Sequence, residues 1–353
     1  MKKVNIIFED GHMFTGEGFG AATEALGEVV FTTSSASYIE DITDPCYTGQ
    51  IIMPTFPSLG NYGMIFQDRL SEHACCAGVI TRSACAEPSN FRSEGRIGDY
   101  LRDEGVPGVQ GVDTRAITRL LRDGMPPRAI ITTRAPEEVM EELKAFNFNA
   151  YDQYSNTSDP HLISPAGDSA ALVALVDLGA PRRQLDALTA LGCEVLLAPM
   201  GTPVSDLILE GCQGVVFSEG PGDPSDYAQC LPGIKAHFGK LPLLGIGLGH
   251  ELMALSCDMQ VTRLCPGHRG GNVPVRELET GRVNITTQNH GYAVLGDFMP
   301  SGAQLLYENC NDGSVEGLLY EDVSSFSMQF HPGSGSRAPQ WGYKRFLDMI
   351  TEG

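Results

Sequence analysis

The chain has 353 residues, of which 42% are hydrophobic, and a formal net charge of −20. This length suffices for two domains with sizeable cores, and the hydrophobic fraction is ordinary for a folded protein. The excess of negative charge disfavours binding to nucleic-acid phosphates and to anionic lipids. No apolar run approaches the roughly 18 residues of a membrane span, and the N-terminal apolar stretch is too short for a signal peptide. We therefore expect a cytoplasmic protein without a nucleic-acid or membrane role.

The ten cysteines contain no CxxC pair and are expected to be reduced and mostly buried. His73, Cys75, Cys76 and Cys85 come nearest to a metal-binding cluster, but their spacing fits no common zinc pattern. We therefore expect no metal site and no cofactor in this chain.

Residues 1–150 are predicted to form a β-rich α+β domain. Short strands are expected at 4–8, 29–33 and 51–55, and helices at 116–122 and 136–146. Asp113 is placed to cap the first of these helices. The glycine-rich segment 16–22 lacks the helix and the acidic residue of a dinucleotide-binding turn, so a hairpin turn is favoured there.

The second half of the chain has the pattern of an α/β fold. Residues 151–169 are polar and aperiodic, which predicts a linker. From residue 170 onward apolar strands alternate with an amphipathic helix at Leu185–Leu191; the strands are expected at 171–178, 193–199, 214–217 and 241–246. Alternating units with strands buried on both faces predict a doubly wound, mostly parallel sheet over 170–353.

The segment 241–251 combines an apolar strand, a glycine-rich turn and the start of a helix. This is the architecture of a nucleophile elbow, in which a sharp turn presents a reactive side chain. Gly245 and Gly249 would allow the turn, and a thiol at its centre would be activated by the helix N-terminus. The central residue is Gly247, which has no side chain to react.

Several motifs around the elbow carry a family resemblance. The chain resembles class I glutamine amidotransferases through Ser-Glu-Gly-Pro-Gly-Asp-Pro (218–224), Gly-His-Arg-Gly-Gly-Asn (267–272), Gln-Asn-His-Gly-Tyr (288–292) and Gln-Phe-His-Pro (329–332). Its first half resembles the N-terminal domain of the carbamoyl-phosphate synthetase small subunit through Gly-Glu-Val-Val-Phe (27–31), Thr-Asp-Pro-Cys-Tyr-Thr-Gly-Gln (43–50), Gly-Asn-Tyr-Gly (60–63) and Gly-Val-Asp-Thr-Arg-Ala-Ile-Thr-Arg (111–119). The resemblance covers nearly the whole chain.

The resemblance implies a catalytic triad that this chain has lost. Active relatives hydrolyse glutamine with an elbow cysteine, a histidine and a glutamate, and the matching positions here are Gly247, His331 and Gly333. Two of the three reactive side chains are therefore absent. A histidine left alone after a strand is more often structural than catalytic, so we expect a structural role for His331.

The implied glutamine pocket is altered as well. Glu251 stands where the family has glutamine, Cys46 where it has serine, and Glu219 where asparagine is usual. An ionised Glu251 would only accept hydrogen bonds and would repel the α-carboxylate of glutamine. Cys46 would approach the amino-acid end of glutamine, so we do not expect it to replace the nucleophile.

Other positions of the implied pocket are retained. Those that match glutamine-binding or oxyanion-stabilising groups of the family are Gly220, Gly222, Leu248, Asn289, Gly291 and Tyr292. The glycines would also suit a plain turn that binds nothing.

Three functions remain open. The chain is a docking subunit, unable to hydrolyse glutamine, of an ammonia-using synthetase whose large subunit binds ATP and Mg; or it is an active glutaminase subunit; or it is a module that binds another ligand. The resemblance includes a precedent for the first, since the vertebrate ammonia-dependent synthetase has also lost the elbow cysteine. In the third, Glu251 would favour an amine or another cation. The retained N-terminal motifs favour the first hypothesis, which would connect the chain to pyrimidine or arginine biosynthesis.

Overall fold

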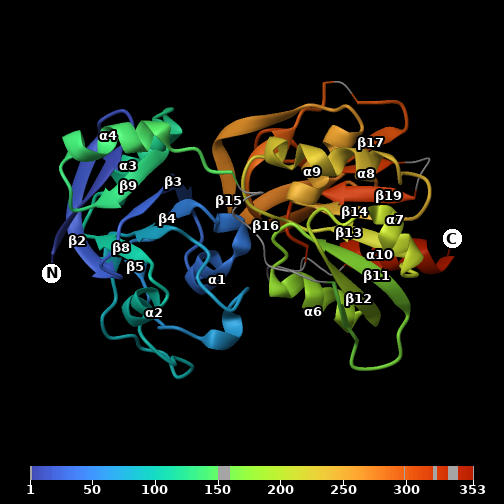
Figure 1. Cartoon of the computed structure of the whole chain (residues 1–353), viewed down its shortest axis with the longest axis horizontal. Helices are drawn as coiled ribbons and strands as arrows, with labels where there is room; N and C mark the ends of the chain where they lie inside the picture. The colour runs from blue at the N-terminus through green and yellow to red at the C-terminus, as the bar shows by residue number, and fades with distance from the viewer. Residues whose placement is uncertain (1, 150–159, 298, 321–323, 333–340, 353) are drawn as a thin grey trace. The chain divides into compact units, whose positions relative to one another are not determined.

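The computed structural model describes residues 2–149, 160–297, 299–320, 324–332 and 341–352. The chain divides into two compact units, Met1–Phe148 and Asn149–Gly353, which are shown in Figure 1 and described separately below.

The first unit is built around a closed β-barrel. Its strands are β1 (Lys3–Phe8), β2 (Met13–Gly20), β3 (Ala25–Thr32), β4 (Gln50–Pro54), β6 (Gly78–Ile80), β8 (Pro107–Gln110) and β9 (Arg128–Thr132), paired in the order β1-β2-β8-β6-β4-β3-β9. β5 (Ser58–Leu59) and β7 (Ser83–Ala84) form a separate small sheet. Ile6, Phe8, Ile51, Ile80 and Val109 are fully buried in one apolar cluster of this unit.

Four helices accompany the barrel, namely α1 (Tyr38–Thr43), α2 (Ile97–Asp103), α3 (Thr114–Arg122) and α4 (Pro136–Ala145), with short 3-10 turns at Pro45–Tyr47 and Phe66–Asp68. The predicted cap of α3 is confirmed, because the Asp113 carboxylate accepts a hydrogen bond from the Ala116 amide at 3.0 Å. The predicted hairpin turn at 16–22 is wrong, since β2 runs through Gly20. A Cβ on Gly16 would lie 2.3 Å from the Gln110 carbonyl oxygen, so glycine here lets two strands pack closely.

The second unit contains a ten-stranded sheet. Its strands are β10 (His161–Ile163), β11 (Ala171–Asp177), β12 (Cys193–Pro199), β13 (Gly214–Phe217), β14 (Leu243–Ile246), β15 (Val261–Glu277), β16 (Val283–Val294), β17 (Ala303–Asn309), β18 (Val315–Tyr320) and β19 (Ser325–Met328). They follow the order β10-β12-β11-β13-β14-β19-β18-β16-β15-β17. The predicted α/β class is confirmed, and β12, β11, β13, β14 and β19 are its parallel part.

Two features of this sheet differ from what the sequence pattern indicated. β10 lies inside the segment predicted as linker and pairs antiparallel with β12. Beyond β19 the sheet continues as antiparallel strands, because β18 pairs antiparallel with β19 and the long strands β15 and β16 form a ribbon. This antiparallel part contributes side chains to the candidate site described below.

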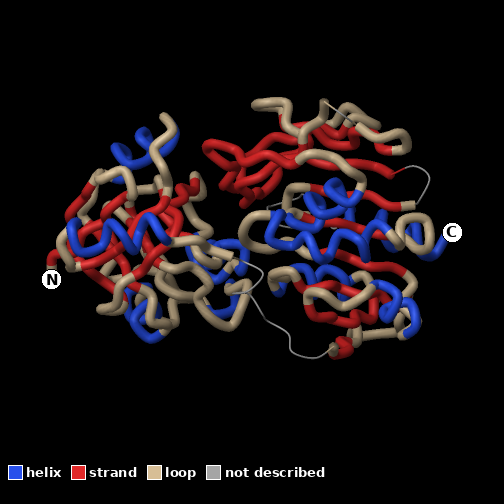
Figure 2. Tube along the Cα trace, turned by 45° about the horizontal axis from the view of Figure 1, so that its top comes forward, coloured by secondary structure: helices blue, strands red, loops and turns tan. Residues whose placement is uncertain are grey.

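Helices cover both faces of the parallel strands. The helices of this unit are α6 (Arg182–Ala190), α7 (Val204–Leu209), α8 (Leu231–Lys235), α9 (Leu248–Ser256) and α10 (Trp341–Glu352), with a 3-10 segment at Pro224–Cys230. Leu244 packs in one cluster with Leu188 of α6 and Phe346 of α10, whereas the next residue, Gly245, faces Met253 of α9. Figure 2 shows these helices against the strands of the unit.

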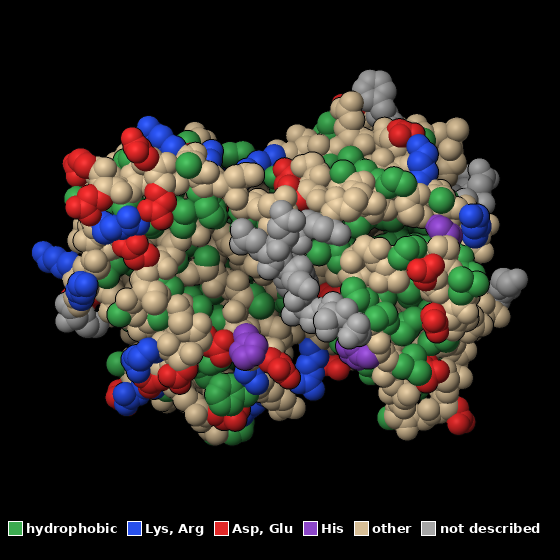
Figure 3. All heavy atoms as spheres, in the orientation of Figure 1, with side chains coloured by type: hydrophobic (Ala, Val, Ile, Leu, Met, Phe, Trp, Pro, Cys, Tyr) green, Lys and Arg blue, Asp and Glu red, His purple; other side chains and the backbone are tan. Residues whose placement is uncertain are grey.

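No helix in the described ranges is long and apolar enough to cross a membrane. The charge of −20 does not form one continuous acidic patch on the face drawn in Figure 3, where acidic and basic side chains are interspersed.

Candidate functional site

The elbow predicted from the sequence is present at the end of β14. Gly247 connects β14 directly to α9 with φ 55° and ψ −113°, a conformation that side-chain-bearing residues rarely adopt. Its amide donates a hydrogen bond to the Met328 carbonyl of β19 at 2.8 Å, and its carbonyl accepts one from the Glu251 amide at 3.2 Å. The backbone therefore has the sharp strand-to-helix geometry of a nucleophile elbow, with no side chain at its centre.

The glycines on either side of Gly247 are required by packing. A Cβ on Gly245 would lie 2.5 Å from the Gly249 carbonyl oxygen, and a Cβ on Gly249 would lie 2.2 Å from the Phe217 carbonyl oxygen. At Gly247 the nearest neighbour of an added Cβ is the Cβ of Glu219, at 3.0 Å. A nucleophile at the elbow would therefore meet the Glu219 side chain first.

Glu219 lies in a buried group of charged and polar side chains beside the elbow. It is 1% exposed, it follows β13, and its Oε2 accepts a hydrogen bond from Nη2 of Arg183 at 2.6 Å. Oε2 also contacts Nδ1 of His331, which is 3% exposed. His331 is held by its amide, which donates to the Thr287 carbonyl of β16 at 3.0 Å. The histidine at the triad position thus faces a carboxylate from a different loop.

The charges around Glu219 favour its ionised form. Burial alone would raise the pKa of this carboxyl, but Arg183 and His331 outweigh burial and hold the pKa below its usual range. The group is therefore an ion pair with Arg183 at neutral pH. It can bind charge or orient the histidine, and the side chains of Glu219, Arg183 and His331 include neither a thiol nor a hydroxyl group.

Glu251 corrects an expectation from the sequence. It lies in the first turn of α9, is 3% exposed, and its Oε1 accepts a hydrogen bond from Nε2 of Gln329 at 3.0 Å. Burial raises its pKa to about 8, with the charge of Asp223 acting in the same direction. At pH 7 the side chain is mostly the neutral acid, which donates and accepts hydrogen bonds as an amide does. In this form it does not repel the carboxylate of glutamine.

The retained loops of the implied pocket are brought together. Gly222 has φ 88°, and a Cβ on Gly220 would lie 2.2 Å from the Leu178 carbonyl oxygen, so both glycines have backbone reasons to be glycine. The Tyr292 hydroxyl donates to Asp223 Oδ2 at 2.8 Å and so connects β16 with the loop after β13.

Three further positions of the implied glutamine pocket are Leu248, Asn289 and Gly291. Leu248 is the first residue of α9, and its amide is among the four at a helix start that have no acceptor within the helix. Asn289 and Gly291 lie on β16, and Nδ2 of Asn289 has no hydrogen-bond partner among the described residues. Leu248 thus follows the elbow directly, and Asn289 and Gly291 lie on a strand that contacts α9.

Two of the sequence-predicted positions remain, Gly333 and Cys46. Gly333 lies outside the described residues. Cys46 lies in the first unit, buried in the 3-10 turn at Pro45–Tyr47, where its amide donates to the Asp44 carboxylate at 3.0 Å. Burial raises the pKa of the thiols for which the structure indicates a shift, namely Cys75, Cys76, Cys193, Cys212, Cys230 and Cys257. No described thiol with a shifted pKa is therefore activated as a nucleophile.

Sequence reasoning missed Arg183 and Gln329. Arg183 is the second residue of α6, far from every motif quoted above, and only the fold brings it to Glu219. Gln329 is the first residue of the Gln-Phe-His-Pro motif, so its position in a motif was a signal that could have drawn attention to it.

Comparison with known proteins gives a consistent result for both units. The family model of the carbamoyl-phosphate synthase small chain, CPSase domain, matches residues 6–131, and that of glutamine amidotransferase class-I matches residues 174–343. A carbamoyl phosphate synthase small chain from Fusobacterium nucleatum is 41% identical and covers 98% of this chain and 97% of its own. A carbamoyl phosphate synthase pyrimidine-specific small chain from Halalkalibacterium halodurans is 40% identical over 99% of this chain and 97% of its own. A solved glutamine amidotransferase from Thermotoga maritima, 18% identical, covers 52% of this chain and 83% of its own with a TM-score of 0.39.

Proposed function

The chain belongs to the carbamoyl phosphate synthase small chain family, and we propose that it is a member of that family that does not hydrolyse glutamine. In this proposal it serves as the docking subunit of a synthetase that uses free ammonia. The observation that supports the proposal is the elbow at Gly247, which keeps the backbone of a nucleophile site and lacks the nucleophile.

The expected loss of glutaminase activity follows from the sequence of steps in the reaction. Hydrolysis of an amide through a covalent intermediate begins with attack by a thiolate or an alkoxide, and every later step acts on the acyl group so formed. Gly247 offers neither. The amides near the elbow could still polarise a bound carbonyl, but in protease triads the loss of the nucleophile lowers kcat by about a million-fold.

Glu219 would hinder the restoration of a nucleophile at position 247. Its Cβ lies 3.0 Å from the position of a Cβ on Gly247, and its carboxylate pairs with His331 and Arg183. In a working triad the histidine accepts a proton from the nucleophile. Here Nδ1 of the histidine faces the Glu219 carboxylate, as it would face the orienting carboxylate of a triad, but no nucleophile stands at Gly247 for Nε2 to serve.

In this proposal the chain's remaining role is to bind the large subunit of the synthetase. The family relation covers both units over nearly their whole length, which is expected if the chain still forms the subunit contact while its glutaminase site has decayed. In the proposed complex ATP and Mg bind to the large subunit, and ammonia is taken from solution.

The test is co-purification followed by two assays. The full chain and its cognate large subunit are mixed at micromolar concentration and separated by size, and the joint peak is supplied with ATP, Mg²⁺ and bicarbonate. We expect carbamoyl phosphate from added ammonia and none from glutamine above background. An unrelated glutaminase added to the glutamine reaction is the control, because it should restore product formation and show that the assay detects released ammonia.

Each alternative function gives a different result. Product from glutamine without the added glutaminase would show an active small subunit and overturn the proposal. Separate elution of the two chains would remove the docking role and leave a ligand-binding module as the better explanation.

A further inference from the structure

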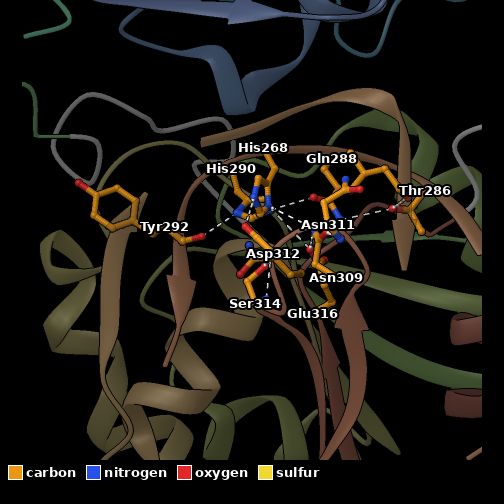
Figure 4. A network of polar contacts seen from close by, with 12 residues as sticks. His268, Thr286, Gln288, His290, Tyr292, Asn309, Asn311, Asp312, Ser314 and Glu316 are labelled. Atoms are coloured by element: carbon orange, nitrogen blue, oxygen red, sulfur yellow. Dashed lines mark hydrogen bonds and ion pairs between the residues drawn. The ribbon is translucent and has the colours of Figure 1, made fainter. Parts of the chain in front are cut away.

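A second group of polar side chains lies on the antiparallel strands of the second unit. His268 on β15 and His290 on β16 are direct cross-strand partners, and Glu316 is on the neighbouring strand β18. One nitrogen of each ring and one carboxylate oxygen of Glu316 all lie within 4.8 Å of one another. Figure 4 shows the two imidazoles close together, with Asp312 and Glu316 near them.

The hydrogen bonds of His290 fix which nitrogen is free to bind a ligand. Its Nδ1 lies 2.6 Å from the Tyr292 carbonyl oxygen, and a carbonyl oxygen can only accept, so Nδ1 carries the proton. Nε2 lies farther, at 3.2 Å, from the side-chain oxygen of Gln288, so the shorter contact at Nδ1 holds the proton and Nε2 keeps a lone pair. Burial, together with the neighbouring ring of His268, lowers the pKa of His290 well below its usual value, so the ring stays neutral. A neutral imidazole with its other nitrogen held by a carbonyl is the form that binds metals.

His268 is held in the same way by a carboxylate. Its Nε2 lies 2.9 Å from Oδ2 of Asp312, whose other oxygen accepts the Ser314 amide at 3.0 Å. The proton therefore belongs on Nε2. Nδ1 faces inward, 3.4 Å from Nδ2 of Asn309 and 3.8 Å from Oε1 of Glu316. A histidine oriented by a carboxylate behind it is a recurrent arrangement around bound metal ions.

Glu316 supplies the observation that points to a ligand. Its side chain is fully buried, Oε1 accepts a hydrogen bond from Asn309 at 2.8 Å, and Oε2 has no hydrogen-bond partner among the described residues. A buried carboxylate oxygen without a partner is costly, and buried polar groups are as a rule satisfied. Burial raises the pKa of this carboxyl to about 7, so a cation would also stabilise the charge that burial disfavours.

We propose that His268, His290 and Glu316 bind one divalent transition-metal ion of the zinc class through Nδ1 of His268, Nε2 of His290 and a carboxylate oxygen of Glu316. Two imidazoles and a carboxylate select zinc, cobalt or nickel over magnesium and calcium, which prefer oxygen ligands alone. Metal–ligand bonds of about 2.0–2.1 Å would bring the ligand atoms to roughly 3.4 Å apart, so binding needs side-chain shifts of about 1 Å. The side-chain oxygen of Gln288, 3.2 Å from Nε2 of His290, lies where a fourth ligand or a metal-bound water would be.

This site could not be predicted from the sequence, because its ligands come from three different strands at spacings that match no zinc motif. Only the register of the β15–β16 ribbon places the two histidines opposite each other. The inference is independent of whether the elbow hydrolyses glutamine.

The test is metal binding to the full chain after treatment with a chelator and its removal. Calorimetric titration with Zn²⁺ should show one equivalent bound with a dissociation constant in the micromolar range or tighter. Because the chain has ten cysteines, X-ray absorption must identify the ligands: we expect nitrogen and oxygen at about 2.0–2.1 Å and no sulfur at about 2.3 Å.

Variants separate the proposed site from surface binding. Glu316→Gln and His290→Asn should abolish the stoichiometric binding, and Asp312→Asn, which keeps all three ligands, should weaken it by about 10–100-fold. His73→Asn is the matched control, because His73 also pairs with a carboxylate, that of Glu104, but is exposed; it should bind as the wild type does. Circular dichroism checks that each variant is folded. If a variant of one of the three ligands does not fold, Asp312→Asn still tests the proposal.

Lack of stoichiometric binding, sulfur in the first coordination sphere, or unchanged binding by folded Glu316→Gln or Asp312→Asn would each overturn the proposal. The cluster would then be a hydrogen-bonded network that joins three strands.

Discussion

Replacing Glu251 with glutamine should stabilise the second unit at neutral and alkaline pH and have little effect at acidic pH. The pKa of Glu251 is about 8 in the folded state, whereas in the unfolded chain the carboxyl has its usual pKa of about 4.5. Between these values the folded state binds more protons than the unfolded state, so the free energy of unfolding falls as pH rises. Glutamine cannot ionise, and its amide oxygen can still accept the hydrogen bond from Gln329.

The size of the effect follows from the pKa difference. Each unit corresponds to about 1.4 kcal/mol, so Glu251 should destabilise the folded state by about 3 kcal/mol at pH 7 and by about 5 kcal/mol at pH 8 and above. The side chain is almost fully buried, so solvent screening does not reduce this figure much. At pH 4.5 and below the wild type and the variant should differ by little.

Urea unfolding at pH 5 and pH 8 measures the difference. The chain has one tryptophan, Trp341 in the second unit, so its fluorescence reports on the unit that contains Glu251. Glu210→Gln, at an exposed position of the same unit, is the matched control and should show the same stability as the wild type at both pH values. An equal effect of Glu251→Gln at the two pH values, or a loss of stability at pH 8, would refute the reasoning.

Three further predictions concern the elbow. Gly247→Ala should lower the free energy of unfolding by about 1–3 kcal/mol, because it places a side chain at φ 55° and near Glu219, whereas Gly233→Ala, which adds its Cβ in open space, should not. Glu219→Gln should lower the free energy of unfolding by about 3 kcal/mol at pH 7, because the partly buried Arg183 loses its ionised partner. The difference should shrink as the pH falls and Glu219 itself is protonated. Gly247→Cys alone should release no glutamate from glutamine. The triple variant Gly247→Cys, Glu219→Asn and Gly333→Glu should release it, because triad members act as a unit. Full activity of the single variant would show that Glu219 does not obstruct the site.

The parallel part of the second unit could be predicted because its strands are short, apolar runs between turn residues. The strands at 193–199 and 214–217 have the expected bounds, and the elbow follows from the spacing of Gly245, Gly247 and Gly249. The ribbon of β15 and β16 escaped prediction because its residues alternate irregularly between buried and exposed and include several glycines and prolines. Such a pattern indicates neither a strand nor a helix.

At the candidate site, too, some properties could be predicted from the sequence and others could not. The motifs identified Gly247, Glu219, Glu251 and His331, since each lies in or beside a recognisable turn. The chemistry of Glu251 could not be predicted, because its pKa depends on burial, which the sequence of one helix turn does not determine.

The pairing of Glu219 likewise depends on the three-dimensional arrangement. Its partners come from α6 and from the segment after β19, and their meeting is a property of the sheet order.

The most direct test of the central claim is to incubate the purified chain with glutamine, alone and with its large subunit, and to measure glutamate release together with intact mass. We expect release at the background rate and no added mass on any of the ten cysteines. Turnover of about 1 per second, typical of a working enzyme, or a glutamyl thioester on any thiol would contradict the account.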